Sequence, residues 1–440
     1  MKSSTCQLKP VAVDIDYQPL ELARGLHQQP GFVFLDTASS DPLNAASKAG
    51  LSILACNPEK IIKGKWLQEN QSAESGIEPL RQELQAGKSL AHSFDCGFPA
   101  GGAIGWFEYD GEYCFGIYHH MLVFDHMRAQ WFEVGDLQSK IDWSKVTDDD
   151  HTEKPTLFEA DFAPSMNRRE FCRRVEQAQE YIAAGDIYQV NLSHEFASPW
   201  PWSTQENKEA AFTLYERLRK MSPAPFAAYL DLDRRQILSS SPELFLRISG
   251  REITTRPIKG TRPRFRDQSA DERSAYELIT SPKEIAELIM ITDLERNDLG
   301  KICEPGSVNV SELLRLERFE QVFHLVSTVN GQLQADTDSL DALLSCFPGG
   351  SITGAPKIRA MQIIAELETT GRGLYTGAIG IFGFNDESIF NIAIRTAMIE
   401  EQQLRFNVGA GIVADSVPEH EFEETLHKAR GIFQACGIDE

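Results

Sequence analysis

Short apolar runs with the length of β-strands recur through the C-terminal part of the chain, and turn-forming residues separate them. Clear examples lie at residues 227–230, 244–248, 378–382, 389–394 and 404–408. Runs of this length, bounded by Gly, Pro, Asn and Asp, are typical of strands. Because strand follows strand through turns as well as through helices, the pattern favours an antiparallel α+β fold over a doubly wound parallel one.

The organisation of the chain changes near residue 160. Before that point, strand-like runs such as 31–35 and 102–107 lie among Gly, Pro and Asp residues. The polar segment 145–155 (KVTDDDHTEKP) fits an exposed connection. Between residues 168 and 184, apolar side chains recur with a helical period. We therefore distinguish an N-terminal region (1–160) from a C-terminal region (161–440).

The composition restricts the partners of the chain. The 65 acidic and 43 basic residues give a formal net charge of −22, which repels nucleic acid and anionic membrane surfaces. We expect neither as a partner. An anionic small molecule would need local Arg and Lys residues or a metal ion. The eight cysteines lack metal-site spacing, and no signal-like or membrane-length apolar run is present, so we expect a cytoplasmic location.

Two predicted helices each carry a pair of carboxylates on one face. Capping-box patterns at 281–284 (SPKE) and 416–419 (SVPE) mark the two helix starts. The paired carboxylates are Glu284, Glu287, Glu421 and Glu424. Lys428 follows Glu424 by four residues and therefore lies on the same face of the second helix. Two helices that each offer two carboxylates suit Mg²⁺, which takes oxygen ligands; the alternative is a solvated face of charged residues.

Lys259 lies in a basic segment, 256–264 (RPIKGTRPR), directly before Gly260. Glycine lets the backbone turn sharply and lets a ligand approach closely. Lys259 is therefore a candidate amine nucleophile, provided that its surroundings favour the neutral amine. The alternative is a surface lysine beside a turn.

Two glycine-rich segments are candidate ligand loops. Residues 347–357 (FPGGSITGAPK) can present backbone N–H groups and the Thr353 hydroxyl to an anion at a helix start. This segment lacks the spacing of a phosphate-binding Walker loop, and Gly409-Ala-Gly411 is too short for a dinucleotide fingerprint. Neither nucleotide class is supported, and a purely structural loop is the alternative for each segment.

Together these segments resemble the chorismate-binding enzyme family, which includes the anthranilate, isochorismate, salicylate and aminodeoxychorismate synthases. The resemblance runs from about residue 171 to 433. Its motifs are DIYQVNL (186–192), SPE (241–243), PIKGT (257–261), ELIMITDLERNDL (287–299), HLVST (324–328), PGGS (348–351), IRT (394–396) and GAGIVAD (409–415). It implies an anthranilate-synthase-like fold of two facing antiparallel sheets flanked by helices, with the active site in a deep cleft.

The resemblance also implies roles for the candidate residues. The expected direct Mg²⁺ ligands are Glu287 and Glu424, with Glu284 and Glu421 beside them. The residues expected to hold the carboxylates of chorismate are Arg395, Tyr375, Thr353, Lys428 and the backbone of Gly409 and Gly411. His324 corresponds to a histidine that lines the cleft, where it would orient the substrate or stabilise charge. A buried structural histidine is the alternative for this residue.

Position 259 distinguishes the branches of the family. Aminodeoxychorismate synthases carry lysine there, whereas the anthranilate, isochorismate and salicylate synthases usually carry alanine. With Lys259, the resemblance implies that chorismate and ammonia give 4-amino-4-deoxychorismate on the way to 4-aminobenzoate and folate. Lys259 would be the covalent nucleophile and Glu243 the proton donor. Gln189 stands where the water-using members of the family carry a lysine base, which disfavours isochorismate synthase chemistry. The alternative activity for this chain is that of anthranilate synthase component I.

No glutamine-hydrolysing module is recognisable in the sequence, so the resemblance implies ammonia from a separate glutamine amidotransferase subunit. Related proteins hold tryptophan in a pocket to which residues 36–40 and 225–226 correspond. Asp36-Thr-Ala replaces the Leu-Glu-Ser of feedback-inhibited anthranilate synthases, which disfavours tryptophan control. An alternative of another class is a silent regulatory subunit that binds chorismate or tryptophan. Lys259 and Glu243 argue against it, because a binding module needs neither a nucleophile nor a proton donor.

Overall fold

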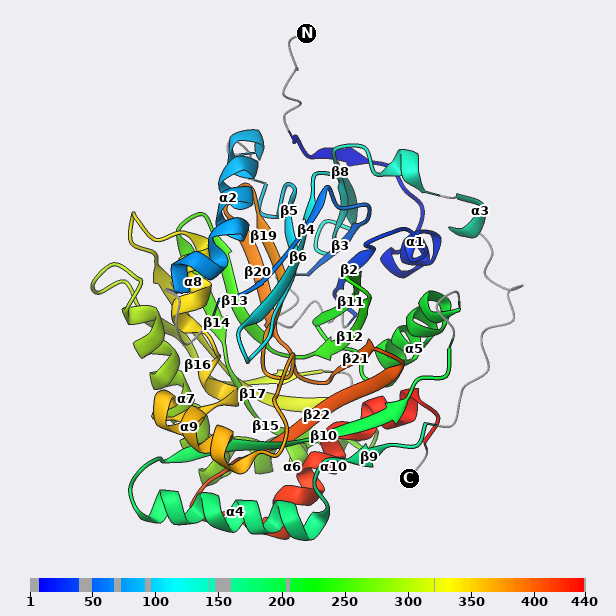
Figure 1. The fold of residues 1–440 in the computed structure, drawn as a ribbon. Helices are drawn as coiled ribbons and strands as arrows, with labels where there is room; N and C mark the ends of the chain where they lie inside the picture. Colours follow the sequence, from blue (N-terminus) through cyan, green and yellow to red (C-terminus); the bar gives the residue numbers. More distant parts are fainter. Residues whose placement is uncertain are drawn as a thin grey trace.

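Two large antiparallel sheets form the centre of the molecule in the computed structural model (Figure 1). The structure describes residues 8–38, 50–66, 73–91, 96–141, 143–146, 160–202, 206–319 and 321–438. Within these ranges, all the paired strands run antiparallel. The predicted α+β fold of two antiparallel sheets with helices is confirmed.

The first sheet has the strand order β1-β8-β7-β3-β2-β11-β12-β21-β22-β10-β18, and β9 pairs with β10. Its strands are β1 (Val11–Val13), β2 (Val33–Asp36), β3 (Leu51–Ala55), β7 (Met121–Asp125), β8 (Gln130–Val134), β9 (Ala163–Pro164), β10 (Gln189–Pro199), β11 (Phe226–Leu232), β12 (Arg235–Ser241), β18 (Gly354–Ala355), β21 (Thr396–Glu400) and β22 (Gln403–Ile412).

The second sheet has the order β15-β17-β14-β13-β20-β19-β5-β6-β4, and β16 pairs with β17. Its strands are β4 (Lys60–Lys65), β5 (Gly102–Phe107), β6 (Glu112–Tyr118), β13 (Leu244–Ser249), β14 (Glu252–Arg256), β15 (Ile258–Pro263), β16 (Asn309–Arg318), β17 (Val322–Gln332), β19 (Ala378–Gly383) and β20 (Glu387–Ile392). Each sheet combines strands from both sides of residue 160, because β2 pairs with β11 and β5 pairs with β19. The two regions of the sequence are thus parts of one pair of sheets.

Helices cover the sheets. On the first sheet lie α4 (Arg168–Ala183), α5 (Asn207–Met221), α9 (Lys357–Leu367) and α10 (Pro418–Ala435); against β15, β16 and β17 lie α6 (Gln268–Ile279) and α7 (Pro282–Gly300). The remaining helices are α1 (Pro19–Leu26), α2 (Ala73–Ala91), η2 (Gln138–Lys140), α3 (Trp143–Val146), α8 (Ser339–Cys346) and η3 (Gly350–Ile352). None of the helices in the described ranges has both the length and the apolar character that a membrane crossing requires.

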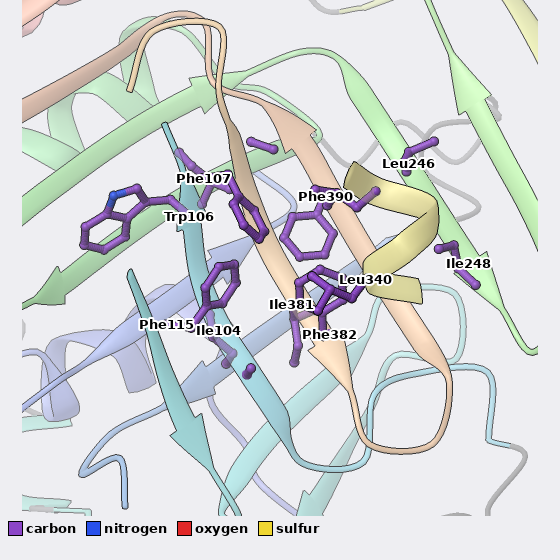
Figure 2. Close-up of a cluster of buried hydrophobic side chains, with 14 of the residues drawn as sticks. Ile104, Trp106, Phe107, Phe115, Leu246, Ile248, Leu340, Ile381, Phe382 and Phe390 are labelled. Atoms are coloured by element: carbon purple, nitrogen blue, oxygen red, sulfur yellow. The ribbon is translucent and has the colours of Figure 1, made fainter. Parts of the chain in front are cut away.

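The face of the second sheet that is turned toward α2 and α8 is rich in buried aromatic side chains (Figure 2). The Phe382 and Phe390 ring centroids lie 4.5 Å apart, and those of Phe107 and Phe115 lie 5.0 Å apart. Fully burying one such side chain contributes about 1.5–3 kcal/mol. The opposite face of the second sheet is turned toward the first sheet, where Ile381 lines a pocket together with Leu35 and Ile53.

Several local predictions can be compared directly with the structure. The runs predicted as strands correspond to β11, β13, β19, β20 and β22, and the predicted helix at 168–184 corresponds to α4. Ser281 begins α7 as predicted, because its side chain accepts a hydrogen bond from the Glu284 N–H. The predicted cap at Ser416 is wrong. Val417 is the N-cap of α10, since the Ser416 Oγ accepts the Val413 N–H at 3.1 Å and holds the preceding turn instead.

Of the polar segment predicted as an exposed connection, residues 147–155 lie outside the described residues.

Candidate active site

The candidate residues lie where β15, β17 and β22 meet α7 and α10, in the lower half of Figure 1. Helix α7 packs on β15 and β17, and α10 packs on β22. Residues that are far apart in the sequence, such as Lys259 and Glu424, are brought into one electrostatic environment. The site is therefore built by the sheets and helices together, and no single motif contains it.

Lys259 lies on β15 beside Glu287 of α7. Gly260 has a φ of +74°, and the register between β15 and β17 shifts at this point; such a bulge redirects a side chain. The Lys259 Nζ is 3.9 Å from the Glu287 Oε2, and the lysine side chain is 16% exposed. A Cβ at Gly260 would lie 3.0 Å from the Glu284 Oε2. The close approaches that this glycine allows are made by Leu278 of α6, whose Cδ1 would be 2.7 Å away, and by the Glu284 carboxylate of α7.

Gly411 makes room for Gln189 next to Lys259. A Cβ at Gly411 would collide with the Gln189 Nε2 and would lie 3.6 Å from the Lys259 Nζ. Gln189 donates a hydrogen bond to the Glu287 Oε2 at 3.5 Å, while its own Oε1 is buried without a hydrogen-bond partner. Buried amide oxygens are normally hydrogen-bonded. The free Oε1 is thus an acceptor available to a ligand N–H or O–H group.

Glu243 is a buried carboxyl between β12 and β13, with 4% of its surface exposed. The Ser351 Oγ donates a hydrogen bond to its Oε1 at 2.6 Å. Burial raises the pKa of Glu243, and the Ser351 hydrogen bond and the positive charge of Lys259 oppose this shift. A carboxyl whose pKa is raised by burial retains its proton more readily near neutral pH. Glu243 therefore has the properties of a proton donor.

His324 lies on β17 and is almost completely buried. Its Nδ1 lies 3.3 Å from the Gly260 carbonyl oxygen and 3.0 Å from the Thr261 Oγ1. Burial, together with the nearby charge of Arg395, lowers the pKa of His324 to about 3. The ring is therefore neutral near pH 7, and it can act by hydrogen bonding and shape. Of its two expected roles, orientation fits this environment better than stabilisation by a positive charge.

Lys283 of α7 lies among the four predicted metal ligands. Its Nζ is 3.5 Å from the Glu421 Oε1. Burial disfavours its charge, but the nearby carboxylates outweigh burial and raise the pKa of Lys283. Those carboxylates are Glu421, Glu287, Glu424 and Glu284. The two helices therefore bring the predicted ligands to one place, around a lysine that the sequence did not single out.

The carboxylate cluster supplies hard oxygen donors of the kind that Mg²⁺ prefers. Within the described residues, no three His, Cys, Asp or Glu side chains gather with the geometry of a metal site. The carboxylates instead pair with lysines, as the Lys428 Nζ does with the Glu424 Oε1 at 2.7 Å. The Glu421 Oε2, however, is buried without a hydrogen-bond partner. A buried, unpaired carboxylate oxygen is costly, so this oxygen is available to a cation, and the Mg²⁺ assignment of the cluster stays a prediction.

Arg395 lies between β20 and β21 with a φ of +50°. A non-glycine residue in the left-handed region is uncommon and often lies at a functional site. Burial lowers the pKa of Arg395, and the charge of Glu243 opposes this shift. A partly buried guanidinium next to the proposed proton donor provides the local positive charge that an anionic substrate needs.

Tyr375, Lys428 and Gly409 form the adjoining part of the site. The Lys428 Nζ donates a hydrogen bond to the Gly409 carbonyl at 2.8 Å. A Cβ at Gly409 would lie 2.7 Å from the Tyr375 Oη. Tyr375 therefore approaches β22 through the space left by this glycine. Three of the residues predicted to bind substrate carboxylates are thus neighbours.

The glycine-rich loop at η3 differs from its expected use. The Gly350 N–H donates to the Glu295 Oε1 at 3.0 Å, and the Thr353 Oγ1 donates to the Gly349 carbonyl at 2.9 Å. Thr353 is fully buried. The acceptor at the Gly350 N–H is thus the carboxyl group of Glu295, whose pKa burial raises to about 7, and the Thr353 hydroxyl stabilises the loop. A role for Thr353 in substrate binding stays a prediction.

A pocket of about 40 Å³ lies between the sheets at the expected tryptophan position. Its lining includes Asp36, Thr37, Pro225 and Phe226; residues 39–40 of the expected pocket lie outside the described residues. Asp36 accepts hydrogen bonds from the Arg219 Nε at 2.6 Å and the Ser52 Oγ at 3.1 Å. A volume of this size holds a few water molecules, and the carboxylate is already paired. Tryptophan binding stays a prediction that this pocket does not favour.

Sequence reasoning missed three residues of the site: Lys283, Ser351 and Glu295. Lys283 lies inside the capping pattern at 281–284 and directly precedes the predicted ligand Glu284. This position in the sequence could have identified it as a residue of the site. Ser351 belongs to the PGGS motif, but its partner Glu243 is 108 residues away. No spacing rule links such distant residues.

The sequence matches the family model described as chorismate binding enzyme over residues 47–434. The chain belongs to the chorismate-binding enzyme family. This confirms the resemblance deduced from the motifs and makes the chain a member of a family of chorismate-utilising enzymes.

Individual members of the chorismate-binding family show how the chain is related to its branches. Aminodeoxychorismate synthase component 1 of Bacillus subtilis (strain 168) is 36% identical over 437 residues, which cover 90% of this chain and 92% of that protein. Anthranilate synthase component 1 of Streptomyces coelicolor is 46% identical over 272 residues, which cover 62% of this chain and 52% of that protein. The chain therefore has relatives in both branches.

A solved structure of the family supports the fold. Anthranilate synthase component I from Streptococcus pneumoniae TIGR4 superposes with a TM-score of 0.71 at 30% identity, and the match covers 87% of this chain and 92% of that chain. The predicted anthranilate-synthase-like architecture is therefore confirmed.

Proposed function

We propose that this chain is the synthase subunit that converts chorismate and ammonia to 4-amino-4-deoxychorismate, on the way to 4-aminobenzoate and folate. The observation that carries the proposal is the position of Lys259, largely buried and 3.9 Å from Glu287 in the centre of the site. The Bacillus subtilis relative, which matches along most of its length, is named for this activity.

Chorismate carries two carboxylates, and the cations of the site are suited to them. Arg395 and Lys428 would bind these groups, with Tyr375 and the backbone of Gly409 beside them. Mg²⁺, when held by Glu287 and Glu424 with Glu284 and Glu421 nearby, would supply a positive charge for the ring carboxylate. The neutral His324 would orient the ring through its hydrogen-bonding environment.

The first chemical step would be attack by the neutral Lys259 amine on carbon 2 of chorismate. Both ring double bonds shift, the bond between carbon 4 and its hydroxyl oxygen breaks, and Glu243 donates a proton so that water leaves. The Lys259 nitrogen loses one proton as its new bond forms. The raised pKa of Glu243 supports its assignment as the acid.

The second step would be attack by ammonia on carbon 4. Both double bonds shift back, the bond between carbon 2 and the Lys259 nitrogen breaks, and the lysine regains a proton while the incoming nitrogen loses one. The covalent stage therefore sends the amino group to carbon 4 instead of carbon 2. Gln189 offers a free amide oxygen near Lys259, which can accept a hydrogen bond from an entering N–H group.

Ammonia would be supplied by a separate glutamine amidotransferase subunit. The name of the Bacillus subtilis relative, component 1, supports a multisubunit enzyme. Glutamine should therefore support turnover only when the partner is added, whereas ammonium salts should support it with this chain alone.

Product analysis tests the proposal. Purified chain is incubated with chorismate, ammonium and Mg²⁺, and the products are separated and identified by mass spectrometry. The expected product is 4-amino-4-deoxychorismate, which Lys259→Ala should cease to form, while Lys63→Ala, at an exposed surface lysine, should form it normally. Anthranilate as the main product would assign the chain to the branch of its Streptomyces and Streptococcus relatives.

A further inference from the structure

The loop at residues 349–353 lies between two buried carboxylates. The Gly350 N–H donates to the Glu295 Oε1 at 3.0 Å, and the next residue, Ser351, donates its hydroxyl hydrogen to the Glu243 Oε1 at 2.6 Å. Glu295 and Glu243 are 3% and 4% exposed. A short segment of backbone thus connects helix α7 to the proposed proton donor.

The backbone of Glu243 is fixed independently of this loop. Its carbonyl accepts the Ile392 N–H at 3.1 Å, and its own N–H donates to the Ser241 Oγ at 3.3 Å. With the main chain held, the remaining freedom of the residue lies in its side-chain torsions. The Ser351 hydroxyl and the Ile258 N–H both donate to the carboxyl group, and these hydrogen bonds restrict its torsions.

The loop itself has little freedom to move. A Cβ at Gly350 would lie 2.6 Å from the Leu294 Cδ2, and one at Gly349 would lie 3.1 Å from the Ile392 Cδ1. The Thr353 carbonyl accepts the Asn191 N–H at 2.7 Å. The loop is therefore packed closely against α7 and the sheets, and Ser351 is held in a defined position.

We propose that Ser351 and Glu295 are positioning residues for the proton donor, with Glu295 anchoring the loop at Gly350 and Ser351 orienting the Glu243 carboxyl. This inference rests on the proposed function, in which Glu243 protonates the departing hydroxyl. A hydroxyl donor at Oε1 makes that oxygen the poorer site for the acid proton. Oε2 is therefore the better site for the acid proton, and in this arrangement Ser351 would leave that oxygen to face the substrate.

The pH dependence follows from the groups around the acid. The titratable and charged groups that face Glu243 are Lys259 of β15, Lys428 of α10, Arg395, and Glu295 of α7, whose own pKa burial raises to about 7. The Ser351 hydrogen bond stabilises the carboxylate and so lowers the pKa of Glu243. An acid is active in its protonated form, so activity falls as the pH rises through its pKa. Removing the hydroxyl should therefore move the alkaline limb of the rate profile to higher pH.

The test compares Ser351→Ala, Ser351→Thr and Ser351→Val in the full-length chain with chorismate, ammonium and Mg²⁺. Ser351→Ala should lower kcat by roughly tenfold to a hundredfold, as misplaced catalytic groups do, with KM changed by less than about twofold because the serine makes no predicted substrate contact. Its alkaline limb should move up. Ser351→Thr keeps the hydroxyl and should retain more activity than Ser351→Val, which has nearly the same shape.

The second position gives an independent comparison. Glu295→Gln keeps an acceptor oxygen for the Gly350 N–H and should retain more activity than Glu295→Leu, which does not. Rates are compared per folded molecule, with folding measured by circular dichroism, so that a loss of stability is not read as a loss of positioning.

The outcomes separate the two proposals. A normal kcat and an unchanged pH profile for Ser351→Ala, or equal activities for the Thr and Val variants, would overturn the positioning role. The rate is followed as chorismate consumed, and the product is identified in the same samples. Anthranilate as the product would therefore refute the proposed function, while the effect of Ser351 on the rate would still decide the positioning role.

Discussion

The amine of Lys259 and the carboxylate of Glu287 lie 3.9 Å apart, Nζ to Oε2, and their side chains are only 16% and 12% exposed. This contact joins the proposed nucleophile to the carboxylate cluster of α7 and α10. The Gln189 Nε2 donates to the same Glu287 oxygen. A change at the cluster should therefore alter the surroundings of the nucleophile as well as cation binding.

Replacing a predicted metal ligand by its amide should weaken Mg²⁺ binding. A neutral amide is a poorer ligand for a hard dication, so Glu287→Gln and Glu424→Gln should lower the Mg²⁺ affinity, measured by isothermal titration calorimetry, by at least about tenfold. Glu423→Gln changes the neighbouring glutamate, which pairs with Arg168, and should bind normally. Unchanged affinity in either ligand variant would remove that residue from the metal site.

Lys283→Met should have the opposite effect on Mg²⁺ affinity. The Lys283 amine faces the carboxylates that Mg²⁺ would bind, so the lysine and the metal compete for the same negative charge. Removing the amine should tighten Mg²⁺ binding and destabilise the metal-free chain, since like charges are left facing one another. The same calorimetric titration and a thermal melt measure both effects. Weaker binding by this variant would show that Lys283 supports the metal instead of competing with it.

Gly411→Ala should reduce activity without unfolding the chain. The added methyl would collide with the Gln189 Nε2 and displace this flexible side chain from Lys259 and Glu287. We expect kcat to fall by tenfold or more, because displacements of about 1 Å at a reacting centre have effects of that order. Gly300→Ala is the control, since a Cβ at Gly300 meets no atom within 4 Å. Equal rates for the two variants would refute a role for Gln189 beside the nucleophile.

The buried neutral state of His324 should make stability depend on pH. Burial, reinforced by Arg395, lowers its pKa in the folded chain from 6.5 to about 3, so the unfolded chain binds the extra proton first. The stabilisation is complete above the unfolded pKa and is lost as the pH falls from about 6.5 toward 3. The slope for one such group is about 1.4 kcal/mol per pH unit. Urea unfolding of His324→Gln at several pH values should give a shallower slope than the unmodified chain; an equal slope would contradict the assignment.

Much of the fold could be predicted because its signals are local. The strands β19 and β22 are apolar runs bounded by turn residues, and the start of α7 at Ser281 follows from one hydrogen bond between residues three apart. The glycine directly after Lys259 also predicted a sharp turn of the backbone, and the structure has a positive φ at Gly260. The incorrect prediction of a helix cap at Ser416 shows the limit of such signals. The Ser416 hydroxyl accepts a hydrogen bond from the upstream Val413 N–H instead of one from the first turn of α10.

The rest depends on contacts between distant segments. The pairing of β2 with β11 joins residues near 35 to residues near 228, and no periodicity specifies which strands become neighbours. The Ser351–Glu243 hydrogen bond and the use of the Gly350 N–H by Glu295 arise in the same way. The sequence indicated a loop able to bind an anion, but only the structure identifies a carboxylate of the chain as its partner.

The most direct test of the account is whether Lys259 becomes covalently bound to the substrate. Without ammonia the second step cannot occur, so the chain incubated with chorismate and Mg²⁺, then quenched and digested, should carry an adduct on the peptide that contains Lys259. Lys259→Ala should carry none. Repeated experiments that find no adduct, or an adduct on another residue, would contradict the account and favour direct attack of ammonia on chorismate.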